Sequence, residues 1–193
     1  MKFFFMLFAL MMLLAGCSLD NPAGREADNP TRVMPSDNTS CIMRPRPLAL
    51  IAKYQEQVEV IKPPNPAEGD FTVIVEINAT GFCTHLGPSK MYTYEYIDIS
   101  TYPTKIVRSE GAYISSIATG DKLTGWMTGY GYPEEDGSGT RFEGTFYITG
   151  GTGELQGAQG EAEFWGETEK NPDGPNTGWV KFKGYYILDS PAS

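Results

Sequence analysis

Hydrophobic and polar residues alternate in short segments from about residue 69 to the end of the chain. Residues 71–78 carry four hydrophobic side chains on one face, namely Phe71, Val73, Val75 and Ile77. An alternation with a period of two predicts β-strands that bury one face and expose the other. The same pattern predicts strands at residues 91–99, 113–118, 122–130, 141–148, 158–165 and 177–188. Residues 48–57 fit either a short helix or a first strand.

The spacing of these segments indicates how the strands are arranged. Many short strands at regular intervals are typical of an all-β barrel or sandwich. Thr119-Gly120-Asp121, between two of the segments, predicts a hairpin. Closure into a barrel removes the exposed edges of a sheet, and an eight-stranded barrel is either filled by side chains or holds one small ligand. The small inward-facing residues Ala158, Gly160 and Ala162 fit either arrangement.

The N-terminus has the pattern of a secretory signal. Met1 and Lys2 give a positively charged start, and an uninterrupted apolar run follows over residues 3–14. This run is too short for a membrane-spanning helix, which needs about 20 residues. It fits the apolar region of a signal peptide.

Leu14-Ala15-Gly16-Cys17, at the end of this run, resembles the lipobox of bacterial lipoproteins. The resemblance implies that the Cys17 thiol receives a diacylglyceryl group, that cleavage occurs before Cys17, and that the new amine is acylated. Ser18, which is not Asp, implies sorting to the outer membrane. Several acyl chains give a stable anchor, because each buried CH₂ group contributes about 0.8 kcal/mol.

Composition separates the lipobox from the predicted barrel. Residues 18–40 are rich in Pro, Asn, Asp and Ser and have no apolar period, which is typical of a flexible tether. We therefore expect a signal peptide at residues 1–16, a lipidated cysteine with its tether at residues 17–45, and a β-barrel domain at residues 46–193. The protein would lie in the bacterial cell envelope, anchored in the outer membrane at its periplasmic or surface face.

The charge of the chain restricts its partners. A formal net charge of −9 argues against nucleic acid, whose phosphates need a basic surface. The alternating pattern also occurs in outer-membrane barrels, but Glu161 and Glu163 lie on the face that would have to meet lipid. We therefore expect the N-terminal acyl chains, and not the strands, to attach the protein to the membrane.

Two thiols remain once Cys17 is lipidated, those of Cys41 and Cys83. They form either a disulfide, which the exported compartment permits, or two separate reduced thiols. The sequence has one histidine, His85, and no Cys-x-x-Cys, so we predict neither a metal nor another cofactor. Cys83 and His85 would project to the same side of a strand and form a candidate thiolate site, although His85 also fits a structural role at a strand end.

Residues 145–160 (TFYITGGTGELQGAQG) resemble the strand–GGTG–strand signature shared by the allene oxide cyclase and dirigent barrels. Residues 80–87 and 119–123 are similar to further segments of bacterial exported proteins with an allene-oxide-cyclase-like barrel. The resemblance runs over roughly residues 71–166 and implies a small eight-stranded antiparallel β-barrel of calycin-like shape. No catalytic position of either family aligns with a residue of this chain, so the resemblance implies the fold and not the activity.

The glycines of this signature fit structural turns. Gly150, Gly151 and Gly153 either take a positive φ or let two backbones approach closely. A phosphate-binding loop would need a following helix and usually a lysine, whereas a strand follows here and the nearby charge is that of Glu154.

Two functions from different classes fit these features. The first is noncatalytic, in which the barrel binds a small apolar or aromatic ligand or a surface partner. Its candidate ligand-binding residues are Tyr92, Tyr94, Tyr96, His85 and Trp126, although an exposed aromatic stripe or core packing explains the aromatic residues as well. The second is a cyclase or isomerase that guides a reactive lipid-derived or phenolic intermediate. A cavity of at least about 300 Å³ with an inward carboxylate favours the enzyme, and a filled interior leaves only a surface interaction.

Overall fold

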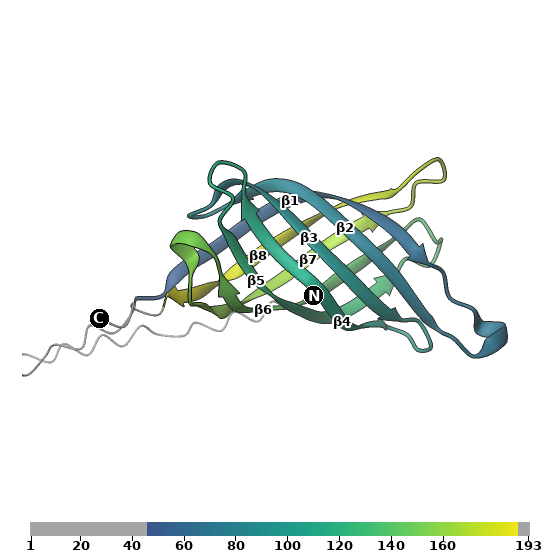
Figure 1. Ribbon diagram of the computed structural model, residues 1–193. Helices are drawn as coiled ribbons and strands as arrows, with labels where there is room; N and C mark the ends of the chain where they lie inside the picture. Colours follow the sequence, from purple (N-terminus) through teal and green to yellow (C-terminus); the bar gives the residue numbers. More distant parts are fainter. Residues whose placement is uncertain (1–45, 189–193) are drawn as a thin grey trace, which may run out of the picture. The chain divides into compact units, whose positions relative to one another are not determined.

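Residues 46–188 form eight long strands in the computed structural model, which describes this part of the chain. The strands are β1 (Leu48–Lys62), β2 (Thr72–Cys83), β3 (Gly87–Asp98), β4 (Thr104–Ser116), β5 (Lys122–Pro133), β6 (Gly139–Gly151), β7 (Ala158–Glu169) and β8 (Asn176–Leu188). Each strand pairs antiparallel with the next one in the sequence, and β8 pairs with β1 to close a barrel (Figure 1). The predicted all-β fold, an eight-stranded antiparallel barrel, is confirmed.

The segment that fitted either a helix or a strand, residues 48–57, forms the first two thirds of β1. Its buried side chains alternate with exposed ones, at Leu50, Ala52, Tyr54, Glu56 and Val58. β1 is paired on both sides, with β2 and with β8, so its backbone groups are satisfied by ladders and not by helical bonds. The inward-facing set of β1 includes a glutamate among apolar residues.

Strand β4 begins at Thr104, well before its predicted start at residue 113. Two consecutive exposed residues, Val107 and Arg108, separate the buried Ile106 from the next buried residue, Ser109. The pairing of β4 with β5 is irregular between Ile106 and Ala112. Because a bulge inserts extra residues into a strand and breaks its period-two pattern, the alternation does not identify this half of β4.

The connection between β6 and β7 contains the three glycines of the GGTG segment. Gly153 opens the 3-10 turn η2 (Gly153–Leu155) with a φ of +59°, a conformation that glycine adopts without strain. A β-carbon at Gly151 would collide with the backbone carbonyl of Leu155, and one at Gly150 would lie 3.1 Å from Thr124 Oγ1. The turn therefore needs glycine at Gly153 for its φ and at Gly151 for the close approach of two backbones.

The interior of the barrel has a filled half and a hollow half. The filled half lies toward the start of β1 and the end of β8, and its largest buried side chains are Leu50, Tyr54, Ile114, Leu123, Phe146, Phe182 and Tyr186. Leu86 from the β2–β3 turn and Leu155 from η2 are buried in the same cluster and cover that end. Ala158 and Ala162, two of the predicted small inward residues, are buried in this cluster. They therefore accommodate packed side chains and not a guest.

Glycines lie opposite inward-facing aromatic rings on neighbouring strands. Phe142 of β6 pairs with Gly166 of β7, and Phe164 of β7 pairs with Gly144 of β6. A β-carbon at Gly166 would lie 2.6 Å from Phe142 Cζ, closer than such contacts allow. The glycines thus leave room for large rings inside a narrow barrel.

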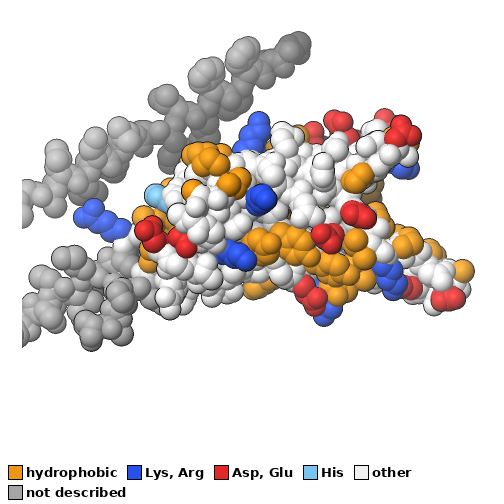
Figure 2. All heavy atoms as spheres, turned by 45° about the horizontal axis from the view of Figure 1, so that its top comes forward, with side chains coloured by type: hydrophobic (Ala, Val, Ile, Leu, Met, Phe, Trp, Pro, Cys, Tyr) orange, Lys and Arg blue, Asp and Glu red, His pale blue; other side chains and the backbone are white. Residues whose placement is uncertain are grey.

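The outer face of the barrel mixes hydrophobic and charged side chains. Figure 2 shows hydrophobic side chains gathered in patches on the surface, with acidic and basic side chains around them. The exposed glutamates Glu161 and Glu163 lie on the outer face of β7. The helical segments of residues 46–188 are the 3-10 turns η1 (Pro66–Glu68) and η2, and no helix there is long and apolar enough to cross a membrane.

Candidate functional site

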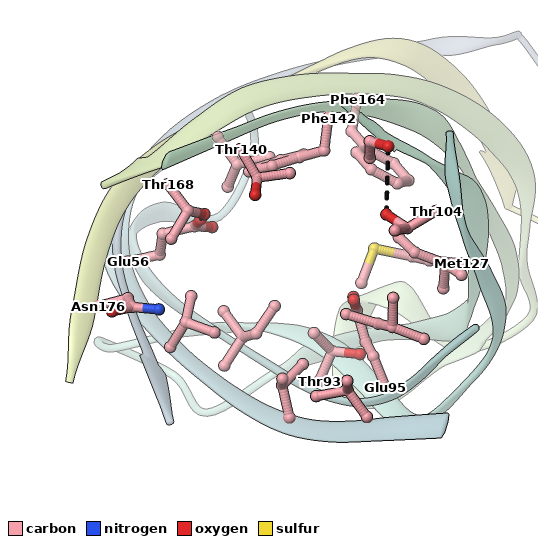
Figure 3. A pocket seen from close by; sticks show the side chains of 18 of the residues that line it. Glu56, Thr93, Glu95, Thr104, Met127, Thr140, Phe142, Phe164, Thr168 and Asn176 are labelled. Carbon is pink, nitrogen blue, oxygen red and sulfur yellow. Dashed lines mark hydrogen bonds between the residues drawn. The ribbon is translucent and has the colours of Figure 1, made fainter. Parts of the chain in front are cut away.

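A cavity of about 260 Å³ occupies the hollow half of the barrel, and all eight strands contribute to its wall (Figure 3). Most of the wall is apolar, with Val58, Val60, Val73, Val75, Ile77, Ile97, Ile99, Ile106, Val180 and the rings of Phe142, Phe164 and Phe182. Met91, Ile106, Met127, Phe164, Val180 and Phe182 belong both to this wall and to the packed core, so the cavity borders directly on the filled half. The interior is therefore neither filled nor as large as about 300 Å³, the size that we expected of an enzyme.

The mouth of the cavity lies at the end of the barrel where β1 ends and β2 begins. Along β1 the exposed fraction of the lining side chains rises from 9% at Val58 to 49% at Val60. Strand β1 begins at the filled end of the barrel, and strand β8 finishes there. Leu86 and Leu155 cover this end. The chain N-terminal to Leu48 therefore joins the barrel at the end opposite the mouth.

Glu56 of β1 projects into the cavity and is 3% exposed (Figure 3). Its Oε1 accepts a hydrogen bond of 2.9 Å from Thr168 Oγ1 of β7. Burial raises the pKa of Glu56 from 4.5 to about 7, and the hydrogen bond from Thr168 opposes this rise. Glu56 therefore changes charge close to neutral pH.

Glu95 of β3 is a second inward carboxyl group, 5% exposed. Within residues 46–188 it makes no hydrogen bond and no ion pair. Burial, and then the charge of Glu56, raise the pKa of Glu95 from 4.5 to about 8. Glu95 is therefore mainly protonated at neutral pH, which lets it donate a hydrogen bond into the cavity.

Thr93 adds a third polar group to this part of the wall. It lies two residues before Glu95 on β3, so both side chains face inward (Figure 3). Thr93 is fully buried, and its Oγ1 has no hydrogen-bond partner among the described residues. A buried hydroxyl without a partner costs free energy, and beside it on the same face Glu95 presents a carboxyl group without a hydrogen-bond partner to the cavity.

The predicted aromatic ligand-binding residues do not line the cavity. Tyr92, Tyr94 and Tyr96 lie on the outer face of β3, because the inward positions of that strand are Met91, Thr93, Glu95 and Ile97. Tyr92 stacks on Tyr113 with 5.5 Å between ring centroids. Trp126 is 44% exposed and stacks on Tyr147 at 4.3 Å. These four residues form part of the outer surface, as in the alternative of an exposed aromatic stripe, and their role in ligand binding stays a prediction.

His85 and Cys83 are also placed away from the cavity wall. His85 is an exposed residue of the β2–β3 turn with a φ of +66°, and its ring contacts that of Tyr186 edge-on at 6.2 Å. Cys83 is fully buried, and its Sγ donates to the carbonyl oxygen of Thr84 at 3.3 Å. Burial raises the pKa of the Cys83 thiol to about 11, which makes it a poor nucleophile at neutral pH.

The lipidation site Cys17 and the second thiol Cys41 lie outside the described residues. The lipid anchor and the Cys41–Cys83 disulfide therefore stay predictions. Within residues 46–188, no group of three or more His, Cys, Asp and Glu side chains is placed to hold a metal ion.

Sequence reasoning missed both cavity glutamates. The signal was present: Glu56 follows Leu50, Ala52 and Tyr54 at the inward spacing of two, and Glu95 follows Met91 and Thr93 in the same way. An acidic residue at an inward position of a strand is unusual enough to mark a site. In residues 91–99 the three tyrosines form the more conspicuous face, and that face points to solvent.

No family model, curated protein or solved structure matches this chain in comparisons with known proteins.

Proposed function

We propose that this protein is an exported lipoprotein, anchored through Cys17, whose barrel binds one small and mainly apolar molecule. The observation that carries the ligand-binding part is the cavity of about 260 Å³ with its apolar wall. Such a cavity is close to the lower limit of ligand sites, about 300 Å³. A hollow interior supports binding inside the barrel over binding of a partner to its surface.

The position of the mouth is consistent with membrane attachment. An anchor at Cys17 joins the barrel through the start of β1, at the filled end. The mouth lies at the other end, beside Val60. The first strand of the barrel therefore begins away from the mouth of the cavity.

The test compares two substitutions on neighbouring positions of β2. Val75→Phe adds a ring to the cavity wall, whereas Ile74→Phe adds the same ring on the other face of the strand. The full chain is purified in lipid nanodiscs from its own cells and examined by native mass spectrometry for a bound small molecule. Cyclohexanol, a small neutral probe, is then titrated into isotopically labelled protein.

We expect wild type and Ile74→Phe to carry a bound molecule or to take up cyclohexanol, with NMR shifts confined to the cavity methyl groups. Val75→Phe should lose this binding while it keeps the circular dichroism of a β-barrel. If neither a bound molecule nor cyclohexanol enters the wild-type cavity, the proposed function is wrong.

The inward carboxyl groups favour a second candidate function, a cyclase or isomerase acting on a lipid-derived or phenolic intermediate. Glu56 and Glu95, with pKa values raised to about 7 and about 8, suit proton transfer at neutral pH in an apolar cavity. The test is incubation of the protein with a lipid extract of its own cells, followed by mass spectrometry with chromatographic separation of isomers. Isomer formation that is lost in Glu95→Gln supports the enzyme, and identical extracts with and without protein contradict it.

A further inference from the structure

We propose that the ligand of the cavity is an apolar amine, whose ammonium group lies between the carboxylates of Glu56 and Glu95. This inference rests on the proposed function, because it names the chemical class of the molecule that the cavity binds. It follows from the charges that line the cavity, from the polar atoms left without partners, and from the apolar wall.

The cavity contains acidic groups without a basic counterpart. Glu56 on β1 and Glu95 on β3 are the only titratable groups among the lining residues. The other six strands contribute neutral residues, which are apolar side chains, three threonines, an asparagine, a glycine and a proline. The nearest ionisable group below Glu56 on β1 is Tyr54, whose hydroxyl is hydrogen-bonded to Ser89 at 2.8 Å and faces the filled half.

The charge of this cavity excludes one class of ligand and favours another. Two buried carboxylates are costly unless a positive charge accompanies them. A carboxylate or phosphate ligand would add a third negative charge where no lysine, arginine or histidine lines the wall. An ammonium group supplies one positive charge, which lowers the cost of ionising the two glutamates.

The unpartnered atoms match the donors of an ammonium group. Glu95 makes no hydrogen bond among the described residues, Thr93 Oγ1 has no partner, and Glu56 has one hydrogen bond, at Oε1. A primary ammonium carries three N–H donors and no acceptor. These donors match the acceptors of the two carboxylates, which enter the cavity from different parts of its wall on β1 and β3 (Figure 3) and are close enough for the charge of Glu56 to raise the pKa of Glu95.

The apolar wall provides for the remainder of the molecule. Val58, Val75 and Ile106 are at most 9% exposed and line the cavity around the two carboxyl groups. A hydrocarbon body buried against them gains about 25 cal/mol for each Å² removed from water. A small polar cation such as ammonium itself would leave this wall uncovered, so the cavity favours an amine with a hydrocarbon body.

The proposal makes a definite prediction about protons. When an ammonium binds to protonated Glu95, the carboxyl group gives up its proton to solvent and the amine keeps its own. Amine binding should therefore release protons, and the affinity should rise by up to about tenfold per pH unit between pH 6 and 8 for each proton released. Binding of a neutral alcohol to the same protonated group releases no proton, and binding of a carboxylic acid should weaken as the pH rises.

The experiment compares three probes of one shape: cyclohexylmethylamine, cyclohexylmethanol and cyclohexanecarboxylic acid. Binding to the full chain is measured by isothermal titration calorimetry at pH 6, 7 and 8, in two buffers of different ionisation enthalpy. The variants are Glu95→Gln and Glu56→Gln, with Glu161→Gln as a control on the exposed face of β7. Circular dichroism checks that each variant folds.

We expect the amine to bind about 10- to 100-fold more tightly than the alcohol at pH 8. The observed binding enthalpy of the amine should differ between the two buffers in proportion to their ionisation enthalpies, which gives the number of protons released. Glu95→Gln should remove most of this preference and the proton release, and Glu161→Gln should change neither. If the alcohol binds as tightly as the amine at every pH, the inference about the amine is wrong and binding in the cavity stands. If none of the three probes binds, the proposed function fails as well.

Discussion

Replacement of Glu95 by glutamine should change how the stability of the barrel depends on pH. Glutamine has nearly the shape of glutamate and carries no charge at any pH. Glu95 is 5% exposed and makes no hydrogen bond among the described residues, so the substitution removes little except the ionisation itself. The free energy of unfolding of wild type and Glu95→Gln should therefore differ in a defined pH range.

The magnitude follows from the pKa of Glu95, which burial and the charge of Glu56 raise from 4.5 to about 8. The folded barrel favours the protonated group, so the stability that this preference provides is complete below pH 4.5 and is lost as the pH rises to about 8. At 1.36 kcal/mol per pH unit, the difference between these two pKa values corresponds to about 5 kcal/mol. Glu95→Gln should thus match wild type near pH 4.5 and be more stable by several kcal/mol at pH 8.

The assay is urea denaturation of the full chain, followed by tryptophan fluorescence at intervals from pH 4.5 to 8.5. Glu161→Gln, a substitution on the exposed face of β7, is the matched control and should follow wild type. A smaller residual slope in Glu95→Gln is expected from Glu56, whose pKa burial raises to about 7. Parallel curves for wild type and Glu95→Gln over the whole range would refute the burial of an ionisable Glu95.

Three further predictions test other parts of the account. Gly166→Ala should lower the free energy of unfolding by at least about 1–3 kcal/mol, because its β-carbon would meet the backbone carbonyl of Trp179 and the ring of Phe142, whereas Gly174→Ala in the β7–β8 turn should cost far less; equal urea midpoints would contradict this close packing. Cys83, fully buried with its pKa raised to about 11, should react with iodoacetamide under reducing conditions much more slowly in the folded protein than in urea, as peptide mass spectrometry measures; equal rates would contradict its burial. Cys17→Ser should abolish fatty-acid labelling and release the protein from the membrane fraction; a variant that stays membrane-bound would overturn the lipoprotein proposal.

The strands could be predicted from the sequence where the side chains alternate without interruption. Strand β7 begins at Ala158, and strand β8 begins at Asn176, each within one residue of its predicted start. The first half of β4 could not be predicted, because the exposed pair Val107 and Arg108 interrupts the alternation where the strand bulges. The local alternation of side chains therefore identifies a regular strand, but it fails to identify a strand that contains a bulge.

The site was harder to predict than the fold, because alternation separates two faces without saying which one is inside. In β3 one face carries Tyr92, Tyr94 and Tyr96 and the other carries Thr93 and Glu95. Hydrophobicity alone favours the tyrosines as the inner face, yet closure of the barrel places Thr93 and Glu95 inside. The exposed tyrosines are covered in part by their neighbours, as in the stacking of Tyr92 on Tyr113. Only the pairing of all eight strands fixes the inward set.

The burial of two carboxyl groups in one apolar cavity is the central claim, and an NMR titration of the glutamate side chains tests it most directly. The carboxyl carbons of the full chain are followed from pH 3 to 9, and the Glu56→Gln and Glu95→Gln spectra assign the two resonances. The account predicts that these two titrate near pH 7 and pH 8, with the Glu95 midpoint falling when Glu56 is replaced. Midpoints for both residues near 4.5, the ordinary value for glutamate, would contradict it.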